Sequence, residues 1–153
     1  MGWHQLLAVA LAGALSLLLI AAGVEDARRR EIANWKNAAI ALAAPLWWYA
    51  NGLGWGDVAW QLGIGLAVFA IFAGVFAAGW MGGGDVKMIA ALALWLPAGA
   101  LLNMLVLMAL AGGAITALML VDSKLRRRSG AVEVPYGVAI AAAALLTISP
   151  TGF

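Results

Sequence analysis

Long apolar stretches alternate with short polar, glycine-containing or proline-containing segments along this chain. The apolar runs cover Leu6–Val24, Ala38–Ala50, Val58–Trp80, Val86–Leu96, Ala98–Val121 and Val134–Ile148. A helix needs ~20 mostly apolar residues to cross the hydrocarbon of a bilayer, so four of these runs approach the length of a membrane span. The pattern predicts an all-α integral membrane protein built as a bundle of six transmembrane helices.

The second and fourth runs are short for a span. Each either extends into its flank or enters the membrane without crossing it. Most basic residues form two clusters, Arg28–Arg30 with Lys36, and Lys124 with Arg126–Arg128. The positive-inside rule puts both clusters in the cytoplasm, which requires an even number of crossings between them. We therefore expect six crossings with both termini outside the cytoplasm. If two of the runs between the clusters did not cross, the number of crossings between them would still be even.

Composition argues for the bilayer as the solvent. Hydrophobic residues make up 65% of the 153 positions and charged residues only 10%, too few to cover a soluble globule. Six spans would use about 120 residues, so we expect one membrane domain over residues 1–153 and no soluble domain. No Lys or Arg precedes Arg28, and Leu6–Val24 is long for a signal-peptide core, so we expect a retained first helix.

The polar residues exclude several classes of function. A net charge of +2 in two short clusters fits membrane orientation, whereas nucleic-acid binding draws on a dedicated basic surface, so no nucleic-acid partner is expected. The chain has no Cys, which excludes disulfides, thiolate zinc sites and cysteine nucleophiles. Its single His4 cannot supply the histidine pair of a metalloprotease, and we expect no metal and no cofactor. A Ser-His-Asp set from His4, Asp57 and Ser149 lacks an oxyanion-type sequence around the serine.

Tryptophan and glycine are both placed in ways that suit a membrane bundle. Glycines at Gly63, Gly65, Gly112 and Gly113 would let helices approach closely. We interpret the tryptophans as interfacial anchors near the ends of the predicted spans. They are Trp3, Trp35, Trp47, Trp48, Trp55, Trp60, Trp80 and Trp95.

Two aspartates stand at the ends of apolar runs on the predicted cytoplasmic side. Asp26 follows the first run, and Asp85 precedes the fourth, directly after Gly82-Gly83-Gly84. Taken singly, each is well explained as a solvated helix-cap carboxylate. Taken together they suit an aspartic-protease dyad, in which two close carboxylates share one proton and act as base and acid. Three glycines beside Asp85 would let a peptide backbone approach it, and no phosphate-loop Gly-Lys-Ser/Thr follows them.

Several short motifs in this order resemble the type IV prepilin peptidases, and more narrowly the short prepilin peptidases of tight-adherence, or Flp, pilus systems. They are Asp26 with Arg28-Arg29-Arg30, Ile32-Ala33-Asn34-Trp35, Gly82-Gly83-Gly84-Asp85-Val86-Lys87 and Pro135-Tyr136-Gly137. The resemblance covers nearly the whole chain. Ala33 stands where the family usually has Pro.

The resemblance implies a membrane aspartic endopeptidase of the bacterial inner membrane, with its active site at the cytoplasmic face. Its substrate would be a prepilin with a basic leader and an apolar helix that remains in the lipid bilayer. Asp26 and Asp85 match the family's catalytic aspartates, Gly82 and Gly84 its signature glycines, and Lys87 the basic residue that follows. Longer members carry a Cys-containing insertion and also methylate the new N-terminus, so the absence of both here implies cleavage without methylation. Neither the pilin nor the oligomeric state is fixed by sequence.

Other residues are candidates for substrate binding or support. Glu25 and Glu31 would either receive the basic leader or pair with the nearby arginines. Lys87 would steady Asp85 or contact the substrate backbone, or else extend to the interface. Pro135, Tyr136 and Gly137 are expected to open the last helix and could line the cleft.

Two other classes of function remain open from sequence. A small channel or proton-coupled transporter would use acidic or polar groups deep within its spans, where this chain offers only a few such as Ser16, Asn103 and Thr116. A general intramembrane aspartic protease would hold its aspartates deeper in the bilayer than Asp26 and Asp85 are expected to lie.

Overall fold

The computed structural model describes residues 2–125 and 134–148, and this part of the chain is all-helical. Arg126–Arg128 of the second basic cluster and Ser149 lie outside the described residues. The predicted all-α class is confirmed, and each helix overlaps one apolar run. The helices are α1 Trp3–Arg29, α2 Asn34–Ala50, α3 Trp55–Ala77, α4 Gly83–Ala93, α5 Ala98–Leu125 and α6 Tyr136–Thr147.

Local sequence explains where the helices begin and end. The α1 helix closes at Arg30, whose φ of 57° is left-handed and whose N–H bonds back to the carbonyl of Asp26. Gly52 and Gly79 have φ of 69° and 77° in the turns after α2 and α3. Asp57 accepts a hydrogen bond from the N–H of Gly54 at 3.1 Å, which caps α3 as expected for that aspartate.

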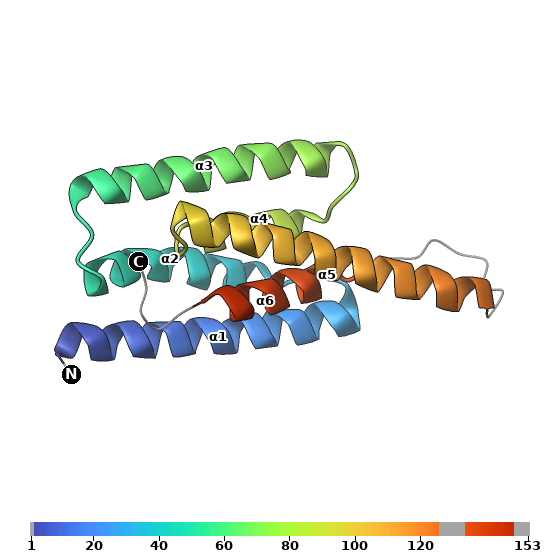
Figure 1. Ribbon diagram of the computed structural model, residues 1–153, viewed down its shortest axis with the longest axis horizontal. Coiled ribbons are helices and arrows are strands. Elements are labelled where there is room, and N and C mark those ends of the chain that lie inside the picture. The colour runs from blue at the N-terminus through green and yellow to red at the C-terminus, as the bar shows by residue number, and fades with distance from the viewer. Residues whose placement is uncertain (1, 126–133, 149–153) are drawn as a thin grey trace.

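The helices alternate in direction. Figure 1 shows α1, α3 and α5 running one way and α2, α4 and α6 running back, so that Arg28–Arg30 and Lys124 come from the same end of the bundle. The turn between α3 and α4 lies at this end too. The architecture therefore gathers the first basic cluster, the described part of the second cluster and the glycine run at one end.

The short helix α4 lies at the centre of the bundle. It packs against α2, α3 and α6, and more lightly against α5. Met88, Ile89 and Leu92 are fully buried in it. Gly65 of α3 permits the close approach of that helix, because a Cβ there would lie 2.6 Å from Leu94 Cδ2. The predicted role in helix packing is confirmed for Gly65, whereas it is wrong for Gly63 and Gly113, where an added Cβ would meet nothing within 4 Å.

Side chains from α2 and α3 cap the C-terminal end of α4. Trp47 Nε1 donates to the Trp95 carbonyl at 3.0 Å, and Trp48 Nε1 donates to the Leu94 carbonyl at 2.7 Å. Gln61, only 2% exposed, donates to the carbonyls of Ala93 and Leu96. These donors satisfy carbonyls that a helix end leaves unpaired, which is costly where water is scarce.

The capping corrects the interpretation of three tryptophans as interfacial anchors. Trp47, Trp48 and Trp95 are buried, and Trp95 Nε1 itself donates to the Ile40 carbonyl at 2.8 Å. They hold helices together because each indole has a buried carbonyl partner. The others are exposed, as anchoring requires: Trp3, Trp35, Trp55, Trp60 and Trp80.

Replacement of Gln61 by leucine is expected to destabilise the bundle by about 1–3 kcal/mol, because the Ala93 and Leu96 carbonyls lose a buried donor. A lower midpoint of thermal unfolding in detergent would measure it. Leu62→Ala, at an exposed position on the same helix, is the control and should leave the midpoint nearly unchanged. Equal midpoints for Gln61→Leu and the wild type would contradict the capping role.

Within the described residues, three helices are long and apolar enough to cross a membrane: α1, α3 and α5. At 1.5 Å per residue, the 11 residues of α4 and the 12 of α6 each cover less than about 20 Å, short of a ~30 Å hydrocarbon layer. These apolar helices mark a helical membrane protein, whose short central helix α4 packs against four other helices.

Candidate active site

A pocket of about 460 Å³ opens at the end of the bundle where α1 stops and α4 starts. It contains both aspartates that the sequence singled out. The wall is made by the last turn of α1, the segment that follows it and the start of α4. Its residues are Glu25, Asp26, Arg29, Arg30, Glu31, Ile32, Ala33, Asn34, Gly82, Gly83, Gly84 and Asp85. We call it the carboxylate pocket.

Asp26 is held against the start of α6. Its side chain is 5% exposed, and its Oδ2 accepts a hydrogen bond from the N–H of Val138 at 3.2 Å. The N–H of Gly137 also bonds to this carboxylate. An aspartate in the last turn of a helix faces the unfavourable end of that helix's dipole, whereas the N-terminus of α6 is a favourable partner. The fold thus fixes Asp26 through a helix distant in sequence.

Gly137 leaves no room for a side chain beside Asp26. A Cβ at this position would lie 2.8 Å from both Cγ and Oδ2 of Asp26 and 2.8 Å from Ile32 Cδ1. Because real Cβ atoms do not approach other atoms so closely, only glycine fits without moving the carboxylate. Gly137 is therefore a support for Asp26, in the class predicted for it.

Asp85 occupies the first turn of α4. Gly82 is the N-cap of that helix, and its backbone hydrogen-bonds the Asp85 side chain, which is half of a capping box. Burial, followed by the nearby charge of Asp26, raises the pKa of Asp85 from its ordinary value of 3.8 to about 6. The two carboxyl groups are thus close enough for their protonation to be coupled, and the proton belongs to the pair.

The glycine run is tied to the start of α2. Asn37 Nδ2 donates to the carbonyl of Gly84 at 3.0 Å, and Asn37 is 4% exposed. A Cβ on Gly84 would lie 3.5 Å from Ile32 Cβ, so the backbone of α4 runs close to the segment between α1 and α2. Asn37 could not be singled out from sequence, because an asparagine beside an apolar run resembles any polar residue at a helix end.

Glu25 has a partner that the sequence interpretation did not name. Its Oε2 accepts a 2.6 Å hydrogen bond and ion pair from Lys36 Nζ and a 3.1 Å bond from the N–H of Ala33. Lys36 is 8% exposed and also donates to the Ala21 carbonyl at 3.2 Å. The expected pairing of Glu25 with arginines is therefore corrected, and Lys36 joins α1 to α2 instead of serving only as a topology charge. Glu31 is exposed at the pocket.

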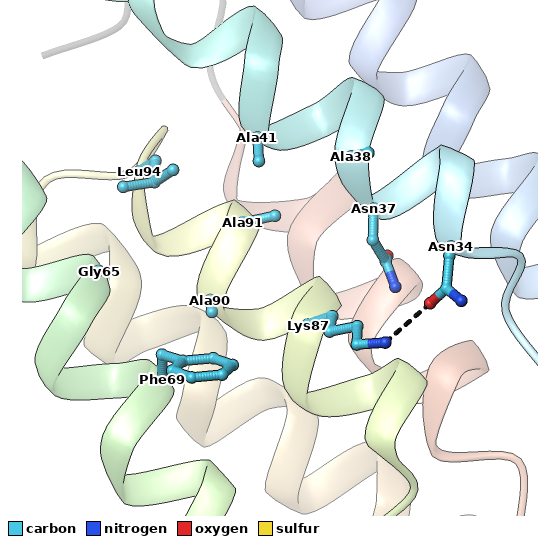
Figure 2. A pocket seen from close by; sticks show the side chains of 10 residues that line it. All are labelled: Asn34, Asn37, Ala38, Ala41, Gly65, Phe69, Lys87, Ala90, Ala91 and Leu94. Carbon is cyan, nitrogen blue, oxygen red and sulfur yellow. Dashed lines mark hydrogen bonds between the residues drawn. The ribbon is translucent and has the colours of Figure 1, made fainter.

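Lys87 does not face Asp85. Its Nζ donates to Asn34 Oδ1 at 2.9 Å (Figure 2), across the start of α2 and α4. Two residues further along a helix than Asp85, it points to a different side. This corrects the interpretation in which Lys87 steadies the Asp85 carboxylate.

The Pro-Tyr-Gly motif opens α6 as predicted, with Pro135 as its N-cap and Tyr136 as its first residue. Tyr136 packs against α5, because a Cβ on Gly112 would lie 3.0 Å from Tyr136 Cε1. Neither Pro135 nor Tyr136 lines the carboxylate pocket, so the expectation that the motif lines the cleft is corrected. Its contribution to the pocket is the backbone that holds Asp26.

The competing serine and metal sites gain no support from the described residues. The ring of His4 lies 4.2 Å from Trp3 and 5.4 Å from Tyr49 between centroids, and Asp57 caps α3, while Ser149 lies outside the described residues. Within residues 2–125 and 134–148 no group of three or more potential metal ligands gathers. Ser16 and Thr116 are two of the few polar residues that a channel or transporter could use, and the hydroxyl of each donates to a carbonyl of its own helix, at 2.8 and 2.7 Å.

A dyad with one shared proton can perform general acid–base chemistry on a peptide bond. The ionised carboxylate takes a proton from an attacking water, and the protonated partner donates to the carbonyl oxygen. Gly82, Gly83 and Gly84 line the same pocket as the two aspartates.

Comparison with known proteins bears on this site. The sequence model of the type IV leader peptidase family matches residues 13–117, more than half of the chain, and this range includes Asp26 and Asp85. No curated protein and no solved structure matches the chain.

Proposed function

The chain belongs to the type IV leader peptidase family, and from this premise we propose that Asp26 and Asp85 form the catalytic pair of an aspartic prepilin peptidase. Membership makes the protein a leader peptidase, a hydrolase acting on prepilins. The single observation that carries the aspartic mechanism is that the side chains of Asp26 and Asp85 line one pocket.

We infer a substrate of the Flp type, with a basic leader followed by an apolar helix. The carboxylate pocket holds four acidic side chains, Glu25, Asp26, Glu31 and Asp85, against the two basic side chains of Arg29 and Arg30, and this excess supports a cationic leader. Glu25 is engaged by Lys36, so exposed Glu31 is the freer of the two to meet the leader. The apolar helix stays in the lipid bilayer while the junction reaches the aspartates.

We propose six crossings, both termini outside the cytoplasm and the carboxylate pocket at the cytoplasmic face of the bacterial inner membrane. The alternating helix directions support this, because they bring Arg28–Arg30 to the same end as Lys124. The short α4 would cross within the shelter of α2, α3 and α6, where irregular backbone at its ends has protein partners.

We also propose that this protein does not methylate the mature pilin. The chain has no Cys and no room in its short inter-helix segments for the cytoplasmic insertion that accompanies methylation in longer relatives.

Purified protein in lipid vesicles, incubated with a Flp-type prepilin, tests this function. Mass spectrometry of both products, with and without S-adenosylmethionine, should show a released leader and a mature N-terminus of unchanged mass. A methyl group on the product would contradict the absence of methylation. An intact prepilin of the cognate pilus would contradict the peptidase assignment.

The cleavage rate is expected to depend on pH through the shared proton. The charged groups in the same pocket are Glu25, Asp26, Arg29, Arg30 and Glu31. Because the pKa of Asp85 is raised to about 6, the protonated acid is lost as the pH increases through that value. We expect kcat/KM to fall on the alkaline side of a profile from pH 5 to 9. A rate that rises steadily to pH 9 would exclude a carboxylic acid as the proton donor.

A further inference from the structure

A second cavity, of about 410 Å³, lies between α2, α3 and α4 (Figure 2). Small and apolar side chains make most of its wall, and Asn34, Asn37 and Lys87 stand at one end. We call it the apolar groove. Its apolar residues include Ala38, Ala41, Gly65, Phe69, Ala90 and Leu94.

The groove faces the side of the bundle. Both α2 and α3 pack against α4, yet they make little direct contact with each other, so α4 forms the floor between them. Figure 1 shows α3 set apart from α2 along its length. Exposed Phe69 and Ala38 stand on either side. A hydrophobic molecule can therefore reach the groove laterally from the lipid.

The groove adjoins the carboxylate pocket. Asn34 lines both, and its hydrogen bond to Lys87 marks the boundary. The same helix supplies Asp85 to the first cavity and, within its next turns, Lys87, Ala90 and Ala91 to the second. A chain with its scissile bond at Asp85 would meet polar surroundings on one side and apolar surroundings along α4.

We propose that the apolar groove binds the first large apolar side chains of the prepilin on the carboxyl side of the scissile bond. This rests on the proposed function. The substrate has the matching order, a charged leader and then an apolar segment. A helix with its side chains is about 10–12 Å across, so a cavity of about 410 Å³ takes side chains from one face and leaves the helix itself in lipid.

Photo-crosslinking tests the occupant. A benzophenone amino acid replaces Phe69 in the groove or, as the matched control, exposed Ile71 on the opposite side of the same helix. In vesicles with a Flp-type prepilin, the probe at position 69 should capture the apolar segment of the pilin, and the probe at 71 should capture at least about fivefold less. Capture of phospholipid alone at position 69, or equal capture at both positions, would overturn the proposal.

Filling the apolar groove with a larger side chain gives a second test of the proposal. Ala38→Leu should raise KM for the prepilin roughly tenfold with little change in kcat, because added methylenes occupy the binding space. Ala70→Leu, at an exposed position that does not line the groove, should leave KM unchanged. An unchanged KM for Ala38→Leu, while the wild type cleaves normally, would overturn the groove and leave the peptidase function standing. No cleavage by the wild type would overturn both.

Discussion

Asp85→Asn is expected to slow prepilin cleavage by at least about 10³-fold, because the pair loses one of the two carboxyl groups that share a proton. General acid–base catalysis by one positioned group contributes ~10²–10⁴-fold, and a dyad needs both members at once. The substitution preserves size and the N-terminal position in α4. Initial rates with saturating prepilin, followed by mass spectrometry, measure the loss.

Stability separates this catalytic loss from misfolding. The folded chain holds the Asp85 proton more tightly than the unfolded chain, since the pKa is raised from 3.8 to about 6. Stability therefore falls as the pH rises through this window, and the cost of the buried charge persists above it. At pH 7.5 the Asp85→Asn variant should unfold at the same temperature as the wild type or a higher one. If the inactive variant unfolded at a much lower temperature than the wild type, misfolding would explain its loss of activity, and the result would contradict catalysis by Asp85.

Gly137→Ala is expected to reduce cleavage by roughly 10²-fold, although residue 137 carries no functional group. The added Cβ would lie 2.8 Å from Asp26 Cγ and from Ile32 Cδ1, so the carboxylate has to move. A displacement of about 1 Å in a catalytic group costs rates of this order. The same shift would lengthen the hydrogen bond from Val138 to Asp26. The variant's kcat, measured under saturating prepilin, tests the effect.

Gly113→Ala is the matched control for this prediction. It is a glycine within a helix of the same bundle, and a Cβ there has nothing within 4 Å. We expect wild-type cleavage from it. If Gly137→Ala also cleaved at the wild-type rate, the positioning of Asp26 by the start of α6 would be wrong.

The helices could be predicted because each one follows from the residues of its own segment. Each apolar run became one helix, and the polar breaks around Arg30, Gly52 and Gly79 became turns. Membership of the leader peptidase family could also be predicted, since its motifs are short and contiguous. The number of crossings stays a prediction, because α4 and α6 are shorter than a bilayer and their depth depends on neighbours.

The pairings between helices could not be predicted. Lys36 reads as a topology charge in sequence, yet it spans the gap to Glu25 in the fold. From sequence, Trp47 and Trp48 are interpreted as interfacial aromatics, but their partners are the carbonyls of Trp95 and Leu94, just after α4 and 46–48 residues away. Hydropathy records the preference of a side chain for lipid or water and carries no information on which distant backbone group it meets.

The contact made by Lys87 could not be predicted either, although this residue belongs to a recognised motif. Its place two residues after Asp85 suggested contact with that carboxylate, while helical geometry turns it toward Asn34. Asn34 and Lys87, both motif residues, thereby fix α2 beside α4 between the two cavities.

The central claim is that Asp26 and Asp85 together cleave the leader. Co-expression of a Flp-type prepilin with the wild type, Asp26→Asn or Asp85→Asn, at matched membrane levels, tests it most directly through the gel shift and N-terminal mass of the pilin. We predict a mature, unmethylated pilin with the wild type alone and the full-length precursor with either variant. Mature pilin produced by either variant at the wild-type level would contradict the catalytic pair.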